Sequence, residues 1–365
     1  MKIALVIQRF RPGGGVERAC ATLARGLLAR GHEVHVFAER IAPFPGLREH
    51  RVPPEGLFQH QSFAAQSRTL LEKESFDVVQ SFSRTAFQDV LRLGGGIHRE
   101  YLLRTDRAYS ALGRWWRRLR AKERWELTLE RESLAPSASL RIIAVSARVR
   151  DEAVRHYGVP ADKIAVIHNG VDAGEFKPSA EARGLIRNQL GLSDSDYLLL
   201  FAGTGFRRKG LDYAIAAVDR VPGARLAVAG EGRARRHPRV LHLGRRSDVA
   251  HLYAAADALL LPTLYDPFPN TALEAMASGI PVVVSRAAGV SELIEGDSIV
   301  VEEPWNVDEL EAAVRRLEDP AVRRPMGEAA RRKALEHPVE RVVDQTLRVY
   351  EEVLAIKKKT ASSSG

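Results

Sequence analysis

Short apolar runs alternate with amphipathic segments along this chain, and that alternation limits the possible folds more than any other feature. Lys2 to Ile7 has the pattern of a buried strand, Val16 to Arg30 that of an amphipathic helix, and Glu33 to Ala38 that of a second strand. Further strand-like runs follow at 77–82, 141–146 and 164–167. This order predicts βαβ units, which are typical of a parallel sheet covered by helices.

Turn residues interrupt the pattern between His168 and Pro178, and the alternation then resumes. Strands are predicted at 197–202, 225–229, 240–243, 258–261, 281–284 and 298–301, and helices at 209–219, 248–255, 271–278, 290–295, 306–317, 321–335 and 339–357. We therefore predict two doubly wound, Rossmann-like α/β domains, 1–170 and 171–340, with one shared ligand cleft at the carboxyl ends of both sheets. The segment 341–365 is expected to return to the N-terminal domain as a helix with a disordered tail.

Composition is that of a soluble globular protein, with 45% hydrophobic and 28% charged residues among 365. We expect no membrane span and no signal peptide, and the single Cys20 fits a reducing cytoplasm and a place in a core. The formal charge of +9 calls for an acidic partner: nucleic acid, anionic lipid or a phosphorylated substrate. Most of the excess lies in residues 98–124, which hold nine basic side chains and three acids.

The stretch from Asp266 to Glu274, Asp-Pro-Phe-Pro-Asn-Thr-Ala-Leu-Glu, has a distinct chemical pattern. Two prolines stiffen a loop, and Asn270 or Thr271 can cap a short helix. A helix N-terminus suits a phosphate, and the acids on either side of it can accept hydrogen bonds from sugar hydroxyls. The pattern indicates either a nucleotide-sugar site or an ordinary strand-loop-helix unit with solvated acids.

Two glycine-rich turns each follow a predicted strand and precede a helix. Gly13, Gly14 and Gly15 allow close approach of a ligand, although the third glycine of a dinucleotide fingerprint is missing and a plain tight turn is the alternative. The second turn, residues 203–210, contains three adjacent cations: Arg207, Arg208 and Lys209. Cations at a helix start oppose the helix dipole, so we expect a diphosphate to balance them; a solvated basic turn is the alternative.

Metal-dependent chemistry has little support in the sequence. Asp194-Ser-Asp196 matches the D-x-D pattern of many metal-dependent sugar transferases, but it lies in a polar loop before a strand, so we predict a plain turn. No cluster of His, Cys and carboxylates has metal-ligand spacing, and we expect cationic side chains to neutralise any phosphate. His98, which follows Gly94-Gly-Gly, is either structural or catalytic.

An apolar stripe is predicted on a helix within the basic region, formed by Leu112, Trp115, Trp116 and Leu119. It is rimmed by Arg114, Arg117, Arg118 and Arg120. Tryptophan beside arginine is typical of a helix in the headgroup region of an anionic membrane, where each cation contributes about 1 kcal/mol. The alternative is that the stripe packs on the domain core. We expect no nucleic-acid binding, since no recognised module is present.

Together these motifs resemble the retaining family-4 glycosyltransferases of the GT-B fold, most closely the lipopolysaccharide-core glucosyltransferase I group. The resemblance covers nearly the whole chain and rests on residues 13–18, 94–100, 168–172, 203–210 and 266–281. It implies an N-terminal acceptor domain and a C-terminal donor domain. One departure concerns the family's usual E-x7-E pattern, because the first acid here is Asp266, whose shorter side chain has a different reach.

By position, the resemblance implies that Arg208 and Lys209 hold the donor diphosphate and that Glu274 takes the ribose hydroxyls. It also implies that Gly14 or Gly15 lies under the donor and that His98 is the active-site histidine. The predicted catalytic residues are His98, Asp266, Arg208 and Lys209; the donor-binding residues are Gly14, Gly15, Gly203, Arg208, Lys209, Asp266, Phe268, Pro269, Asn270, Thr271 and Glu274; and the membrane-facing residues are Trp115, Trp116, Arg117 and Arg118.

The resemblance implies a hexosyltransferase that moves glucose from UDP-glucose, with retention and without a cofactor or metal, onto a lipid-linked saccharide such as the lipopolysaccharide core. We expect it in the cytoplasm, peripheral on the inner face of the cytoplasmic membrane. No enzymic nucleophile is evident, so we expect a front-face route. The alternatives are another family-4 hexosyl or N-acetylhexosaminyl transferase for cell-envelope glycans, a sugar-nucleotide epimerase, and a non-catalytic membrane-surface binding protein.

Overall fold

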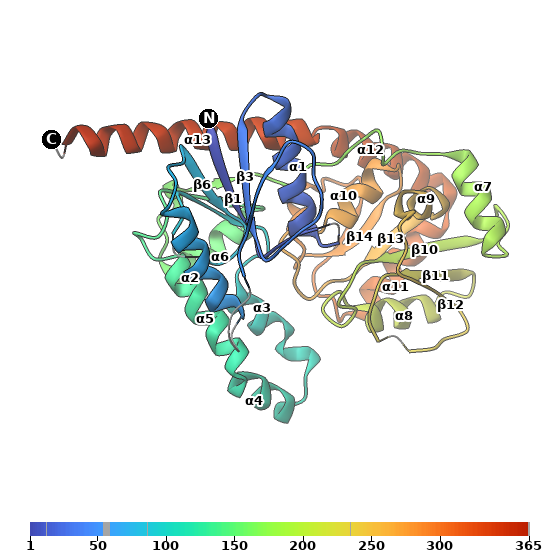
Figure 1. Cartoon of the computed structure of the whole chain (residues 1–365). Helices are drawn as coiled ribbons and strands as arrows, with labels where there is room; N and C mark the ends of the chain where they lie inside the picture. The colour runs from blue at the N-terminus through green and yellow to red at the C-terminus, as the bar shows by residue number, and fades with distance from the viewer. Residues whose placement is uncertain (12, 54–58, 86, 234, 364–365) are drawn as a thin grey trace. The chain divides into compact units, whose positions relative to one another are not determined.

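The chain divides into two compact units, each built on its own parallel sheet (Figure 1). The computed structural model describes residues 1–11, 13–53, 59–85, 87–233 and 235–363. The first unit comprises Met1–Asn169 and Val339–Gly365, and the second comprises Gly170–Pro338. The predicted pair of doubly wound α/β domains is confirmed as the fold class.

The sheet of the first unit has the strand order β5-β3-β1-β6-β7-β8-β9. Its strands are β1 (Lys2–Val6), β3 (Glu33–Ala38), β5 (Arg48–Arg51), β6 (Val78–Ser81), β7 (Val90–Leu93), β8 (Arg141–Ala144) and β9 (Ile164–Val166), and a separate small ladder joins β2 (Arg9–Phe10) to β4 (Arg40–Ile41). The order reverses direction between β1 and β6, where the strands on one side are β3 and β5 and those on the other follow later in the chain.

The helices of the first unit are α1 (Gly15–Ala29), α2 (Gln59–Leu71), α3 (His98–Thr105), α4 (Ala111–Leu119), α5 (Ala121–Ser133), α6 (Ala147–Tyr157) and α13 (Val339–Ser363), with 3-10 turns at Asp106–Ala108 and Ala161–Lys163. Figure 1 shows α13, the red helix, crossing α1, and α4 at the far end of α5, away from the sheet. Across the described residues, every helix is too short or too polar to span a bilayer.

Both faces of the first sheet are buried, as the alternation of side chains along β1 shows. Ile3 and Leu5 belong to one core cluster, and Ala4 and Val6 belong to a second cluster on the other face. Cys20 lies in the first cluster, where burial raises the pKa of its thiol. Its predicted core position is confirmed.

The C-terminal helix α13 packs into the first of these clusters. Val343 and Tyr350 are buried there, and the Tyr350 hydroxyl donates to the Gln80 side-chain oxygen at 2.8 Å. A Cβ atom at Gly26 of α1 would lie 2.4 Å from Val343 Cγ2, so only glycine lets the two helices approach this closely.

The sheet of the second unit has the order β12-β11-β10-β13-β14-β15. Its strands are β10 (Tyr197–Ala202), β11 (Ala224–Ala229), β12 (Val240–Gly244), β13 (Ala258–Leu261), β14 (Val282–Ser285) and β15 (Ile299–Val301). Its helices are α7 (Ala180–Gln189), α8 (Leu211–Asp219), α9 (Val249–Ala255), α10 (Asn270–Ala277), α11 (Val307–Glu318) and α12 (Pro320–Leu335), with a 3-10 turn at Gly289–Leu293.

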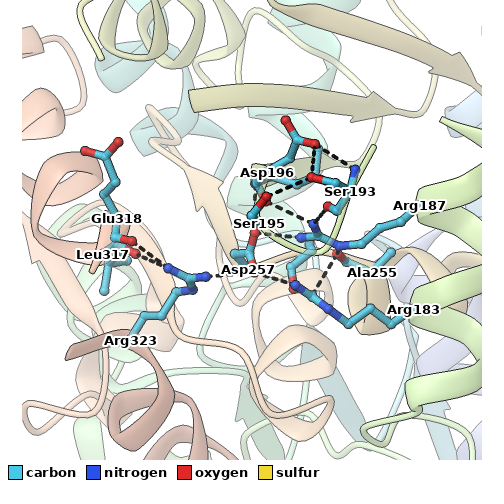
Figure 2. A network of polar contacts seen from close by, with 12 residues as sticks. Arg183, Arg187, Ser193, Ser195, Asp196, Ala255, Asp257, Leu317, Glu318 and Arg323 are labelled. Atoms are coloured by element: carbon cyan, nitrogen blue, oxygen red, sulfur yellow. Dashed lines mark hydrogen bonds and ion pairs between the residues drawn. The ribbon is translucent and has the colours of Figure 1, made fainter. Parts of the chain in front are cut away.

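A buried ionic network fastens α7 and α12 to the second sheet (Figure 2). Arg187, whose side chain is 1% exposed, donates to Asp257 Oδ2 at 2.7 Å, and Arg183 donates to Oδ1 at 2.9 Å. Arg323 lies 3.4 Å from Oδ1. Beside them the Asp196 carboxylate accepts hydrogen bonds from the N–H and the hydroxyl of Ser193, both at 2.7 Å, which confirms a plain turn at the D-x-D pattern.

Two local predictions are wrong, and two strands of the first sheet were not predicted. The segment 290–295 forms a 3-10 turn and not an α-helix. Residues from Lys357 to Ser363 continue α13 where a disordered tail was expected, and the last two residues lie outside the described part of the chain. The strands β5 and β7 had no predicted counterpart.

Candidate active site

Two loops of the second unit leave the sheet at the point where its strand order reverses. Residues 203–210 follow β10 and residues 262–269 follow β13, and these two strands are neighbours. In open α/β sheets, ligands bind at such a switch point, beyond the carboxyl ends of the strands. The cations and acids selected from the sequence therefore lie where this fold binds ligands.

Glycines let these loops pack more closely than other residues would permit. Gly203 has a φ of +139°, and a Cβ there would lie 2.5 Å from Lys209 Cε. Gly210 has a φ of +77°, and a Cβ there would lie 1.9 Å from the carbonyl oxygen of Pro262. The methylene chain of Lys209 is thus held against the Gly203 backbone. The next residue, Gly210, contacts the loop after β13.

Arg208 and Lys209 converge on one oxygen of Asp266. Arg208 Nη1 and Lys209 Nζ each lie 3.1 Å from Asp266 Oδ2. Arg208 Nη1 also donates to the Tyr265 carbonyl at 2.8 Å, which fixes the guanidinium against the loop after β13. Lys209 and Asp266 are 6% and 7% exposed.

The charges of this group perturb one another. Burial raises the pKa of Asp266, but Lys209 and Arg208 outweigh that effect and hold the pKa below its ordinary value. Burial lowers the pKa of Lys209, and Asp266 opposes this only in part. Glu274 also opposes the effect of burial on the pKa of Lys209. Arg208 and Lys209 share one oxygen of Asp266, so they keep hydrogen-bond donors for an anion.

Helix α10 begins without a side-chain cap. The predicted capping by Asn270 or Thr271 is wrong, because Pro269 occupies the N-cap and Asn270 already lies in the helix. Thr271 Oγ1 is buried and has no hydrogen-bond partner among the described residues. A buried polar atom without a partner is costly, so this helix end suits a ligand that supplies acceptors.

Glu274 lies one turn into α10, where it is 6% exposed. The hydroxyl of Tyr253, a fully buried residue of α9, donates to Glu274 Oε2 at 2.9 Å. Tyr253 therefore orients this carboxylate. Sequence reasoning missed Tyr253, since its only signal was an aromatic position in a helix whose other residues, apart from His251, are apolar.

In the first unit, the glycine turn at 13–15 lies close to a second glycine run, residues 94–96, which precedes His98. A Cβ at Gly94 would be 3.4 Å from Val16 Cγ2, so the loop before His98 packs against the start of α1. Gly14 is the extended N-cap of α1, and a Cβ there would lie 2.0 Å from Glu17 Oε2. The Glu17 carboxylate therefore lies against the Gly14 backbone, and donor binding at Gly14 or Gly15 stays a prediction.

His98 is the first residue of α3 and is held by two glutamates of α5. Its Nε2 atom lies 2.7 Å from Glu123 Oε2, and its backbone N–H donates to Glu130. The hydrogen bond from His98 lowers the pKa of Glu123, so this carboxylate stays ionised and keeps a hydrogen on Nε2. The sequence signal for the pair was the seven-residue spacing of the acids, which places them on one helix face.

Glu130 is almost fully buried and closes the N-terminus of α3. It accepts hydrogen bonds from the N–H of Arg99 at 3.0 Å and the hydroxyl of Tyr157 at 2.6 Å, and Arg84 Nη2 lies 3.1 Å away. The free backbone N–H groups at the start of α3 are therefore hydrogen-bonded by a side chain of α5, and His98 is fixed in place.

The predicted membrane-facing residues divide into two groups. Trp115 and Trp116 of α4 are 54% and 58% exposed, and Leu112 beside them is also exposed. Arg117 is not at the surface, and its assignment is wrong: it is 5% exposed, with its guanidinium 4.9 Å from the ring centroids of both Tyr101 and Tyr109. The side chain of Arg118 lies outside the described residues.

Two family profiles match the chain, one in each unit. Residues 13–175 match Glycosyltransferase Family 4, and residues 196–319 match Glycosyl transferases group 1. A probable transglycosylase of Burkholderia thailandensis is 31% identical over 345 residues, which cover 91% of this chain and 91% of the relative. The lipopolysaccharide glucosyltransferase WaaG of Escherichia coli is 24% identical over 340 residues, which cover 87% of this chain and 89% of the relative.

Solved structures share the fold. The crystal structure of WaaG, a glycosyltransferase involved in lipopolysaccharide biosynthesis, has a TM-score of 0.83 at 22% identity and covers 95% of this chain and 99% of that one. The crystal structure of Anabaena HepE in complex with UDP-glucose has a TM-score of 0.75 at 19% identity and covers 96% of this chain and 100% of that one. The two-domain architecture is therefore that of GT-B glycosyltransferases.

Proposed function

Because this chain belongs to glycosyltransferase family 4, we propose that it transfers a hexosyl group from a nucleoside diphosphate sugar to an acceptor hydroxyl. The observation that carries the proposal is the convergence of Arg208 and Lys209 on Asp266, four residues before the uncapped start of α10. The leaving diphosphate gains negative charge as the sugar becomes an oxocarbenium ion. Preorganised cations and helix N–H groups stabilise that charge, which is the largest contribution such a site can make.

The proposed reaction retains the anomeric configuration by a front-face route. The bond between the anomeric carbon and the diphosphate oxygen breaks, the acceptor oxygen bonds to the same face, and the acceptor proton passes to the departing phosphate. Glu274, oriented by Tyr253, takes the ribose hydroxyls, and His98, oriented by Glu123, lies among the catalytic residues. Proton NMR of the product from an α-linked donor tests this, and a β-linked product contradicts it.

We propose UDP-glucose as the donor, with support from the likeness to HepE in its UDP-glucose complex and to a lipopolysaccharide glucosyltransferase. Calorimetric titration with UDP, GDP and their glucose, N-acetylglucosamine and mannose conjugates tests the choice. Binding of UDP-glucose that is lost in Lys209→Ala supports the site and the donor together. Conversion of the donor to another sugar nucleotide without an acceptor would favour an epimerase instead.

The proposed acceptor is a lipid-linked saccharide of the lipopolysaccharide core type, reached from the inner face of the cytoplasmic membrane. The exposed indoles of Trp115 and Trp116 support this, because α4 presents them within the most basic part of the chain. Replacing both with Ala should weaken sedimentation with anionic liposomes about 10-fold, since less apolar surface is transferred into the lipid interface. Leu185→Ala, on an exposed residue of α7, is the matched control. Unchanged liposome binding in the double variant would contradict the membrane contact.

A further inference from the structure

A cluster of metal-ligating side chains lies at one edge of the first sheet. His35 in β3, His50 in β5 and Glu74 in the loop before β6 place one ligand atom each within 4.8 Å of one another. His35 Nδ1 lies 2.8 Å from His50 Nε2 and 3.8 Å from Glu74 Oε2. None of the three belongs to the residues proposed for the donor or the acceptor.

Glu33 sets the tautomer that metal binding requires. His35 Nε2 lies 3.0 Å from Glu33 Oε1. A carboxylate only accepts hydrogen bonds, so Nε2 carries the hydrogen and the lone pair of Nδ1 points at His50 and Glu74. Metal-ligating histidines are oriented by an outer carboxylate in this way.

Aromatic neighbours hold both imidazoles in place. The His50 ring stacks on Phe37 with centroids 4.2 Å apart, and the Phe76 ring meets His35 edge-on at 5.0 Å. His35 is 3% exposed. The rings are therefore already oriented without a metal, which reduces the entropy lost on binding.

The distances fit a small ion after a minor adjustment. Two nitrogens bound tetrahedrally at about 2.0–2.1 Å from zinc lie roughly 3.3 Å apart, between the two separations found in the cluster. Lys2 Nζ contacts Glu74 Oε1 at 2.5 Å, so Oε2 can turn to a metal while this ion pair remains. On metal binding, the hydrogen that His50 Nε2 donates to His35 moves to Nδ1 of His50 or to solvent.

We propose that His35, His50 and Glu74 bind one divalent transition-metal ion of the zinc or cobalt class, with water as a fourth ligand. Two imidazoles and one carboxylate are the donor set these ions prefer. The ion would tie β5 and the loop before β6 to β3. Among the described strands, β5 is a polar edge strand paired with β3, so a metal bond adds a further attachment. The site is structural and independent of the transferase chemistry.

The test uses the full chain without a histidine tag, freed of metal by chelation. Titration with Co²⁺ should give a visible absorption band that saturates at one ion per chain, and Zn²⁺ should abolish the band by competition. His50→Ala and Glu74→Gln should remove saturable binding, and Glu33→Gln should weaken it about 10- to 100-fold because it disturbs the orientation of His35. His251→Ala, on an exposed histidine of α9, should bind as the wild type does.

Thermal unfolding gives a second readout that does not depend on activity. Zn²⁺ should raise the midpoint of the wild type and of His251→Ala but not that of Glu74→Gln. Glu74 is exposed, so this variant is expected to fold, and circular dichroism of the metal-free proteins checks that. Binding that is absent in the wild type, or that persists in both His50→Ala and Glu74→Gln, would overturn the proposal.

Discussion

Two buried aspartates of the second unit face clusters of cations, and the clusters differ in how completely they are closed. Arginines engage both oxygens of Asp257, Oδ1 through Arg183 and Arg323 and Oδ2 through Arg187 (Figure 2). Oδ2 also accepts a hydrogen bond from the N–H of Leu198. In contrast, both cations at Asp266 converge on Oδ2 alone. The same type of ion group is therefore present twice in one unit, once saturated and once not.

The cations themselves show the same difference. Arg187 binds Asp257 and also donates hydrogen bonds, from Nε and Nη1, to three backbone carbonyls: those of Ala255, Ser193 and Asp196. Among the described residues, Lys209 Nζ makes one hydrogen bond although it has three hydrogens. A saturated network has no capacity for a ligand and contributes only to stability, whereas an unsaturated one keeps donors for an anion. We infer that Asp257 holds the fold and that Asp266 holds the cations for the donor.

The largest effect is expected from removing Arg187. Arg187→Ala should lower the free energy of unfolding by about 3–5 kcal/mol, because it leaves a buried carboxylate without its main partner. Arg183→Ala is the matched control on the same carboxylate, and because Arg183 is 28% exposed it should cost about 1 kcal/mol or less. Urea unfolding measures both. If both variants lose the same free energy of unfolding, Arg187 does not contribute more to stability than Arg183 and this distinction is wrong.

Lys209→Ala should have the opposite effect to Arg187→Ala: a large loss of activity with little loss of stability. kcat/KM should fall about 10²- to 10³-fold, since one preorganised charge at the leaving group is lost. The unfolding midpoint should change little, because Arg208 still pairs with Asp266. Arg207→Ala, on the exposed neighbouring cation, is the control and should stay within a few-fold of the wild type. A large loss of stability with normal activity would place Asp266 in the same class as Asp257.

The contrast recurs in the first unit, where Glu130 is saturated and Glu123 is bound to His98. Glu123→Gln should lower kcat on the order of 10-fold while the KM for the donor stays unchanged, because the imidazole loses the charge that orients it. Glu123→Asp should restore part of the activity. Glu132→Gln, on an exposed acid of the same helix, is the control. A change in donor KM alone would mean that Glu123 does not act through His98.

Much of the fold could be predicted because the central strands are buried on both faces. β10 and β13 are apolar throughout, and their predicted ranges match the structure. β5 could not be predicted, since its four residues are all polar and it forms by pairing with β3 at the sheet edge. Local propensity carries no record of that pairing.

The residue types of the candidate site could be predicted from the sequence, but the contacts between those residues could not. The cations of 203–210 and the acids of 266–274 were visible as residue types, yet the bond from Arg208 to Asp266 joins residues 58 apart. Arg117 was assigned to a surface because it follows two tryptophans, and the rings of Tyr101 and Tyr109 that bury it come from earlier segments. Contacts of this kind follow from tertiary packing, which periodicity does not encode.

The last prediction concerns the titration of Lys209 in the unsaturated ion group at Asp266. Its effect on stability and activity at neutral pH is the smallest of those predicted. Burial lowers the pKa of Lys209 below its ordinary 10.5. Between the lowered pKa and 10.5 the unfolded chain binds the extra proton, so stability should rise with pH in that window. Donor binding needs the charged ammonium, so kcat/KM should fall over the same window.

Activity and stability should therefore move in opposite directions as the pH rises towards 10.5. The carboxylate does not interfere, because the pKa of Asp266 is held below 3.8, and its contribution to stability is lost only as the pH falls through that lowered value. Lys209→Arg keeps the positive charge to higher pH, so it should shift the alkaline limb of kcat/KM upwards and abolish the rise in stability. pH profiles of kcat/KM and of the urea midpoint measure both. If the alkaline limb stays at the same pH in Lys209→Arg, another group controls it, and Lys209 would belong with Arg187 among the residues that only hold the fold.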